Sequence, residues 1–460
     1  MDPALLESHK SFPVFVVLDG QKKGPLDRLL SVVADVRAGE GAGALLLATN
    51  AFVLMAAYYV LKTVRQSLIL SQFGPENAAY TAAGMAFLLL FLVPAYGAFA
   101  SRVIRVKLIS WVTLFFASHL VIFAALAGSG VRIGVAYFLW LGIFNNLLIG
   151  QFWAFANDLY DEHKGKRLFP LVGVGIAVGG VAGAGFAAAL FRSFGPYRLM
   201  LLAGVVLVVS VGFTLIVNHH ESRQAGSVQH RIAREPIGRK GGFQLVMSNR
   251  YLFLIAAIIL LLNLVNSTGE FLMNKLADAQ AASAVGAQRL AFFGEFAGKF
   301  ATLQNLMVLV LQLFLVSRIF RYWGVRAALF ILPLIAFAGY GLALALPVLG
   351  IVKTVKVLEN STDYSIQNTA RQALFLPTSR EAKYKAKIAI DTFFTRFGDM
   401  LGGLLVLVGS HTSLAMGVRS YAAVNVVLVL AWLALVAAVT REHKKLVPPV
   451  SAAPFRLATS

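Results

Sequence analysis

The dominant pattern along the chain is a series of apolar stretches, each about as long as a membrane-crossing helix. Such a helix needs roughly 20 mostly apolar residues. Six stretches precede a polar interval and six follow it, so the pattern predicts an all-α polytopic membrane protein with about 12 transmembrane helices in two six-helix halves. The predicted spans are residues 43–70, 80–100, 107–128, 133–156, 168–192, 198–218, 251–274, 296–317, 324–347, 349–375, 386–409 and 418–440.

The same pattern divides the chain into five predicted segments. We expect no cleavable signal, because the apolar run Phe12–Leu18 is too short and no small-residue cleavage site follows it. Leu26–Arg37 is a candidate amphipathic helix on the membrane surface. The segments are a cytoplasmic N-terminal segment (1–42), an N-terminal half (43–218), a basic cytoplasmic linker (219–250), a C-terminal half (251–440) and a cytoplasmic tail (441–460).

Composition and charge agree with a membrane protein. The chain is 58% hydrophobic and 13% charged, and its net charge of +20 lies mostly in alternate loops. By the positive-inside rule this predicts that both termini are cytoplasmic, and it argues against a nucleic-acid partner. With no cysteine, disulfides and thiolate metal sites are excluded, and we expect no cofactor. The clustered cations include Arg102, Arg105, Lys107, Lys164, Lys166, Arg167, Arg318, Arg321, Arg326, Arg371, Arg380, Arg441, Lys444 and Lys445.

A short internal repeat supports the division into halves. Ser101–Arg105 (SRVIR) follows the second predicted span, and Ser317–Arg321 (SRIFR) follows the eighth, 216 residues later. Two parallel six-helix halves are the layout of the major facilitators. In that layout the first helix of each three-helix repeat lines a central cavity, and we expect the same arrangement here.

The span at 349–375 carries the heaviest polar load. Each charged residue at a helix centre costs roughly 2.5–3.5 kcal/mol on insertion scales, so these charges must pair or line a wet cavity. Lys356, Asn360, Asp363 and Gln367 are spaced by four, three and four residues and therefore share one helical face. Two interpretations stay open, namely a substrate-facing surface and pairing between helices without substrate contact.

Other spans contribute further candidates. Lys62 and Glu270 lie at related positions of the two halves, and we expect them to approach each other across the cavity mouth; the alternative is that both are interfacial, with Lys62 extending toward the headgroups. Arg396 and Asp399 are three residues apart, close enough to pair. The predicted substrate or coupling-ion residues are Lys62, Arg65, Asn145, Asn146, Glu270, Lys353, Lys356, Glu359, Asn360, Asp363, Asp391, Arg396 and Asp399.

Glycines recur in the span at 168–192. No strand precedes them and no acidic residue follows at the required distance, which excludes a dinucleotide-binding loop. Small residues at this spacing let helices approach closely, and Gly398, Gly402 and Gly403 are expected to do the same in the other half. At the end of the tenth span, Thr378 and Glu381 have the spacing of a capping box. The lysines at 383, 385 and 387 are candidates to meet anionic lipid, or an anionic substrate at the cytoplasmic mouth; the alternative is that they only anchor the cytoplasmic side by the positive-inside rule.

Four segments carry a family resemblance. They are Tyr59–Leu68 (YVLKTVRQSL), Phe152–Asp158 (FWAFAND), Lys166–Pro170 (KRLFP) and Tyr384–Asp391 (YKAKIAID). Together they resemble the nucleotide (ADP/ATP) translocase family, which is related to the major facilitators and is found in plastids and intracellular bacteria. The resemblance runs from about residue 43 to residue 440. It implies exchange of nucleotides, typically ATP for ADP, although related proteins carry other substrates.

The family's functional charges match this chain unevenly. The resemblance places a family lysine on Arg65, which keeps the charge but changes its geometry. A family glutamate falls on Glu270, and a lysine five residues later falls on Lys275. The glutamate expected in the fourth span is missing near Trp140, and a lysine expected in the eleventh falls on Asp399, which reverses the charge.

These observations predict a secondary transporter that works by alternating access and resembles the ADP/ATP exchangers. The expected partners are a small-molecule substrate, with ATP and ADP among the candidates, and membrane lipid. The alternatives are a proton- or ion-coupled carrier of another organic solute and a non-transporting sensor on a carrier fold. The lack of a G-x-x-x-x-G-K-[ST] loop argues against a pumping ATPase, and we expect no enzyme activity. The expected location is the bacterial cytoplasmic membrane.

Overall fold

Helices form all the regular structure in the described part of the chain. The structure is a computed structural model, and it describes residues 23–100, 105–160, 162–224, 242–375, 377–379, 382, 386–411 and 416–446. The helices are α1 (Pro25–Leu30), α2 (Gly41–Ala100), α3 (Arg105–Gly128), α4 (Gly134–Leu159), α5 (Glu162–Gln224), α6 (Gly242–Ser248), α7 (Arg250–Gln280), α8 (Gly286–Val310), η2 (Leu311–Leu315), α9 (Val316–Tyr322), α10 (Gly324–Ala345), α11 (Leu349–Thr362), η3 (Asp363–Gln367), α12 (Asn368–Leu374), α13 (Lys387–Ala389), η5 (Ile390–Phe394), α14 (Thr395–His411) and α15 (Val418–Leu446).

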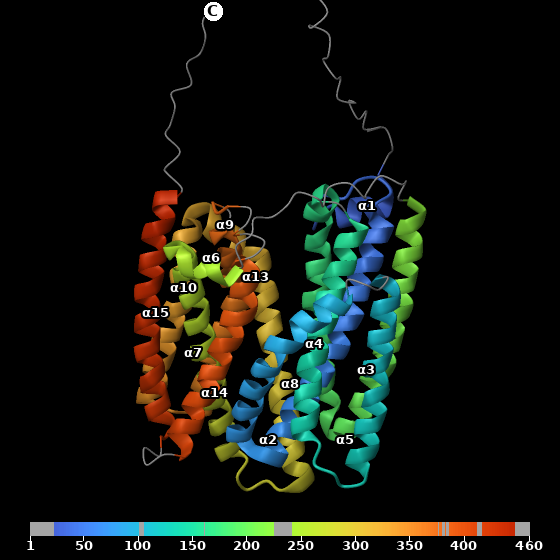
Figure 1. The fold of residues 1–460 in the computed structure, drawn as a ribbon. Coiled ribbons are helices and arrows are strands. Elements are labelled where there is room, and N and C mark those ends of the chain that lie inside the picture. The colour runs from blue at the N-terminus through green and yellow to red at the C-terminus, as the bar shows by residue number, and fades with distance from the viewer. Residues whose placement is uncertain are drawn as a thin grey trace, which may run out of the picture.

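The predicted set of about 12 membrane-crossing helices is present. Nine helices in the described residues are long and apolar enough to cross a membrane. Two of them, α2 and α5, turn back at Gly74 and Gly195, where φ is 81° and 68°. Only glycine adopts such angles readily, so each of these helices supplies two crossings (Figure 1). The last crossing is the continuous helix α11–η3–α12, whose charges set it apart from the apolar spans.

The helices form two groups that lie side by side. Figure 1 shows α1 to α5 in one group and α6, α7, α10, α14 and α15 in the other, with α8 between them. One apolar core draws mainly on Leu30 to Val217, and the other draws mainly on Val246 to Val439. Most of the predicted linker, residues 225–241, lies outside the described residues.

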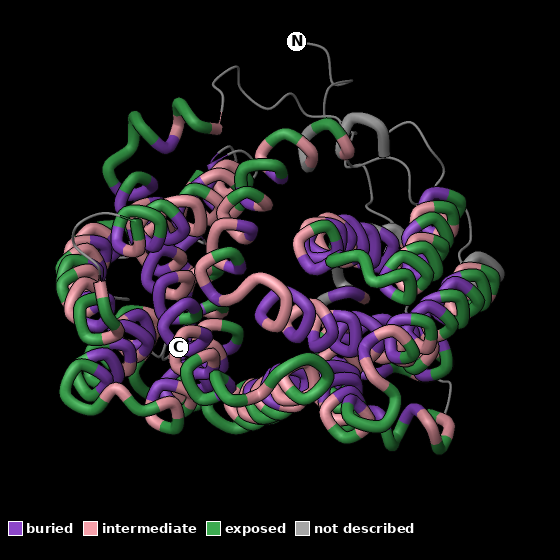
Figure 2. Tube along the Cα trace, turned by 90° about the horizontal axis from the view of Figure 1, so that it is seen from below, coloured by how far each residue is buried: buried purple, intermediate pink, exposed green. Residues whose placement is uncertain are grey.

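The outer surface of the bundle is apolar. In the view along the helices, exposed residues follow the rim and buried residues lie between the helices (Figure 2). Large apolar side chains such as Trp111, Phe91 and Val427 are exposed on this surface. Helices that satisfy their own backbone hydrogen bonds and present apolar side chains outward are suited to lipid as the surrounding solvent.

Glycines bring α5 and α2 into backbone contact, as predicted. A Cβ atom at Gly175, Gly179 or Gly183 would overlap the backbone oxygen of Ala48, Phe52 or Ala56, respectively. The same holds in the other half, where Gly398 lies against the backbone of Leu260, Gly402 against Ser267 and Gly403 against Ala83. The close packing therefore depends on residues without side chains.

The N-terminal segment folds back on the end of the first helix group. The predicted helix Leu26–Arg37 is shorter in the structure, because the Asp27 carboxylate turns the chain. The Asp27 carboxylate accepts hydrogen bonds from the backbone N–H groups of Gly24, Gly39 and Gly41 at 3.0, 3.1 and 3.0 Å. The hydrogen bond from Gly39 is the main cause that lowers the pKa of Asp27 below its usual value.

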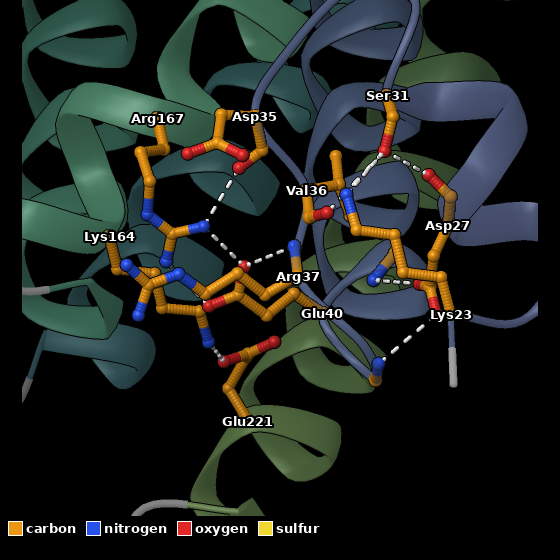
Figure 3. A network of polar contacts seen from close by, with 12 residues as sticks. Lys23, Asp27, Ser31, Asp35, Val36, Arg37, Glu40, Lys164, Arg167 and Glu221 are labelled. Atoms are coloured by element: carbon orange, nitrogen blue, oxygen red, sulfur yellow. Dashed lines mark hydrogen bonds and ion pairs between the residues drawn. The ribbon is translucent and has the colours of Figure 1, made fainter. Parts of the chain in front are cut away.

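An ion pair between Glu40 and Arg167 attaches this segment to α5 (Figure 3). Arg167 donates to both carboxylate oxygens of Glu40 at 2.7 Å, a two-point geometry that fixes the orientation of both side chains. Nearby, Lys164 pairs with Glu221 at 2.9 Å. The segment 23–40 is therefore held against this end of the first helix group.

Three sequence predictions fall on positions outside the described residues. They concern most of the first copy of the repeat, Ser101 to Ile104, the capping partner Glu381 and the lysines at 383 and 385.

Candidate substrate cavity

A cavity of about 280 Å³ lies between the two helix groups. Its wall is built from both arms of α2 and from α4, α7, α8, α11, η3 and α14. These helices come from both halves of the chain, so any molecule bound here would contact both groups.

The structure brings eight of the thirteen predicted site residues together in this cavity. Asn145 and Asn146 reach it from α4, and Asn360 reaches it from α11. The residues that line it are Lys62, Arg65, Asn145, Asn146, Glu270, Asn360, Arg396 and Asp399; Lys353, Lys356, Glu359, Asp363 and Asp391 are not among them.

The predicted pair Arg396–Asp399 forms and also links the two groups. Arg396 Nη1 lies 3.4 Å from Asp399 Oδ2, and its Nη2 donates to Asn146 Oδ1 at 2.9 Å. Ser267 donates to the other carboxylate oxygen of Asp399 at 3.0 Å. Part of the Arg396 charge is thus balanced before any ligand arrives.

Two further cations lie on α2. The Arg65 guanidinium lies 4.3 Å from the centre of the Phe138 ring, and its buried Nε has no hydrogen-bond partner among the described residues. The Lys62 ammonium lies 5.2 Å from the Tyr59 ring centre. In the part of the chain that the structure describes, no ion pair joins Lys62 to Glu270, although both line the cavity.

The ionisable groups of the cavity leave a small positive excess. Lys62, Arg65 and Arg396 face the carboxylates of Glu270 and Asp399, which gives one net positive charge when all five are ionised. Cations that lie against aromatic rings and keep N–H groups available for hydrogen bonding are suited to binding an anionic group.

Lys356 and Glu359 form a separate buried network. The Lys356 side chain is 0% exposed, and its Nζ donates to Glu359 Oε2 at 2.9 Å and to Asn266 Oδ1 at 2.7 Å. Tyr340 donates to the same carboxylate oxygen at 2.9 Å. Around these two residues the geometry is that of pairing between helices, because neighbouring side chains from α7 and α10 cover them.

The other three predicted residues lie apart from the main cavity. Asp363, together with Glu359 and Asn360, borders a second cavity of about 20 Å³. The Lys353 ammonium lies 5.5 Å from the Phe296 ring centre. Asp391 pairs with Lys387 at 2.8 Å beyond the cavity wall. Residues that share one face of a helix therefore need not contact the same neighbour, because that face can pack against two other helices.

Comparison with known proteins places the chain in a family. The model of the TLC ATP/ADP transporter family matches residues 135–345 and 336–443, well over half of the chain. The chain belongs to the TLC ATP/ADP transporter family. The predicted family is therefore confirmed, and it is a family of transporters rather than enzymes.

Relatives of this TLC family member are distant. ADP,ATP carrier protein 1 of Chlamydia pneumoniae is 21% identical over 321 residues, which cover 59% of this chain and 60% of the relative. The chloroplastic ADP,ATP carrier protein 1 of Arabidopsis thaliana is 23% identical over 318 residues, covering 62% of this chain and 50% of the relative. The alignments thus span between half and two thirds of these relatives.

Solved structures show the fold of the TLC protein. The nucleoside transporter NupG covers 87% of this chain and 99% of its own, with a TM-score of 0.61 and 13% identity. A bacterial homologue of the iron transporter ferroportin, in an inward-facing state, covers 87% and 98%, with a TM-score of 0.64 and 14% identity. These likenesses confirm the predicted major-facilitator-like fold.

Sequence reasoning missed the contribution of α8 to the TLC protein's cavity. Phe296, Phe300 and Gln304 lie four residues apart on one face of α8 and line the cavity, as do Ala297 and Ala301. The analogy assigned the lining to the first helix of each three-helix repeat, and α8 is the second of its repeat. A mid-span glutamine beside Asn305 was the available signal.

Proposed function

We propose that this protein is a secondary transporter that exchanges nucleotides such as ATP and ADP by alternating access around the cavity. The observation that carries the proposal is one cavity, shared by the two helix groups, that is lined by Lys62, Arg65 and Arg396, with Lys62 and Arg65 beside aromatic rings. Arginine and lysine bind phosphate groups through charge-assisted hydrogen bonds. Family membership supports the same substrate class.

In this proposal the cavity residues have distinct roles. Lys62, Arg65 and Arg396 hold the phosphate groups, while Asn145 and Asn146 add neutral hydrogen bonds. Glu270 and Asp399 balance the cations when the cavity is empty, which lowers the cost of keeping like charges together. Lys353, Lys356, Glu359, Asp363 and Asp391 act outside direct contact, through the packing of α11 and its neighbours.

We also propose an orientation in the membrane. Figure 1 shows α1 and the end of α15 at the same edge of the molecule. Lys164, Arg167, Arg441 and Lys444 belong to helix segments at that edge, so the positive-inside rule supports its assignment to the cytoplasm. The proposed location is the bacterial cytoplasmic membrane.

The test is uptake of labelled ATP into proteoliposomes that contain the purified protein. Exchange requires substrate on both sides, so we expect uptake into vesicles loaded with ADP and none into empty vesicles. Arg65→Ala should lower the rate at least about tenfold, since a hydrogen bond to a charged group is lost. Arg132→Ala, at an exposed loop position, is the matched control and should not change it. No uptake by folded protein in either vesicle contradicts the proposal.

A second candidate is a proton-coupled carrier of another organic solute. It is favoured by the carboxylates of Glu270 and Asp399 in the cavity, which lower its net positive charge. Uptake into empty vesicles that depends on a pH gradient would support this function over exchange.

A further inference from the structure

Gln304 of α8 carries a buried amide donor in the cavity wall. The Gln304 side chain is 1% exposed and lines the cavity, and its Nε2 makes no hydrogen bond to any residue that the structure describes. Leaving a buried amide donor without a hydrogen-bond partner is destabilising, because the donor has lost its hydrogen bonds to water. A ligand that accepts a hydrogen bond from Gln304 would recover that loss.

Asn360 completes an amide pair with Gln304. The Asn360 Nδ2 donates to Gln304 Oε1 at 3.0 Å, which is the one hydrogen bond of the Asn360 side chain in the described structure. The pair therefore keeps one free donor, Gln304 Nε2, and one free acceptor, Asn360 Oδ1. Both side chains line the same cavity.

Aromatic rings flank this amide pair. Phe300 precedes Gln304 by one turn of α8, and Tyr364 follows Asn360 by one turn of α11–η3, so each ring shares a face with one amide. All four residues line the cavity, and Tyr364 is 52% exposed overall. An exposed ring in a cavity is a surface on which a flat group can stack.

We propose that Gln304 and Asn360 form a nucleobase subsite, with Phe300 and Tyr364 as stacking surfaces; this rests on the proposed function. A base edge presents a donor beside an acceptor, as adenine does with its 6-amino group and N7, and paired amide groups read such an edge. A phosphate offers acceptors only and would leave Asn360 Oδ1 unused. The uncharged amides bind the base, while the cations of α2 and α14 bind the phosphates.

The test compares two competitors of labelled ATP exchange, unlabelled ATP and tripolyphosphate, which lacks a base. In Gln304→Leu we expect ATP to compete about tenfold more weakly, since one hydrogen bond and a buried polar contact are lost, and tripolyphosphate to compete as before. A general packing defect would weaken both competitors. Equal shifts for both, or no shift, would overturn the subsite.

Two further variants sharpen this test. A purine nucleoside triphosphate without the 6-amino group should compete about tenfold more weakly than ATP against the wild-type protein and equally with ATP against Asn360→Leu. Gln367→Leu is the matched control, because Gln367 is also buried with an unpartnered amide oxygen but lines neither cavity. It should leave the ratio between ATP and tripolyphosphate unchanged.

Failure of the proposed function can be told from failure of the subsite. If the wild-type protein takes up no nucleotide, nucleotide exchange is contradicted, and binding of labelled adenosine to the solubilised protein decides the subsite. Adenosine binding that Gln304→Leu weakens about tenfold supports it. No adenosine binding, or binding that this variant leaves unchanged, overturns it.

Discussion

At the scale of residues, two lysines of one helix have different roles although their chemistry is identical. Lys356 is fully buried and held by Glu359 and Asn266, whereas Lys353 lies partly exposed beside an aromatic ring. The two positions differ by three residues, which turns them toward different neighbours. The sequence showed that both lysines are costly to bury in a membrane. Only the structure shows that Lys356 belongs to a buried ion pair and that Lys353 lies against an aromatic ring.

Removing one partner of the Lys356–Glu359 pair should destabilise the protein much more than removing both. Lys356→Met leaves the Glu359 carboxylate buried and uncompensated, so we expect a loss of about 3–5 kcal/mol in unfolding free energy. Combining Lys356→Met with Glu359→Gln removes both charges and should restore most of the loss. Thermal unfolding of the solubilised protein measures this.

The control for the pair is Lys353→Met, which breaks no ion pair among the described residues, removes a contact with the Phe296 ring and should have a small effect. A double variant as unstable as Lys356→Met alone would contradict the interpretation of Lys356 and Glu359 as one compensated unit.

At the scale of helices, glycine acts in two ways in this protein. Gly74 and Gly195 let α2 and α5 reverse, and each therefore supplies two membrane crossings. Elsewhere in α5, Gly175, Gly179 and Gly183 share a face and admit the backbone of α2. The sequence showed the apolar spans and the small-residue face, but the partner of that face depends on how the helices are arranged.

Replacing a contact glycine should disrupt the α2–α5 packing. In Gly183→Ala the new methyl group would overlap the Ala56 backbone, so we expect a loss of about 1–3 kcal/mol, measured as a lower unfolding temperature of the solubilised protein. Gly173→Ala is the matched control on the same helix, because nothing lies within 4 Å of its Cβ position. Equal effects of the two variants would show that close approach is not the reason for the glycines.

At the scale of the whole molecule, contacts between the two groups gather near one end of the helices. Glu76 pairs with Lys275 at 3.4 Å, and Arg192 pairs with Glu295 at 2.8 Å. Tyr80 contacts His411 at 3.1 Å. The turn within α2 and the connection from α7 to α8 lie at the edge away from α1 (Figure 1). Alternating access would require these contacts to break when that end opens.

A covalent link across that end should stop transport. The chain has no cysteine, so Tyr80→Cys combined with His411→Cys gives the only two thiols for a short cleavable crosslinker. We expect labelled ATP exchange to fall to background after crosslinking and to return after cleavage. Each single-cysteine variant, treated in the same way, should keep its rate. Full exchange by the crosslinked protein would mean that this end does not open.

By itself, the sequence determined the helices and most of the polar residues of the site. Lipid requires each crossing segment to satisfy its own backbone hydrogen bonds, so long apolar runs predict helices directly, and buried charges stand out against them. The family resemblance also followed from short local segments such as Tyr59–Leu68. The orientation of the termini stays a prediction from charge.

Only the tertiary structure decided which polar residues meet. It placed Lys62 and Arg65 of α2 and Arg396 of α14 in one cavity, buried Lys356 against Glu359, and brought Gln304 of α8 beside Asn360. The physical reason is that a residue's position along a helix sets its direction relative to that helix alone. Whether the side chain then meets a partner, a cavity or lipid depends on the neighbouring helices, which come from distant parts of the chain.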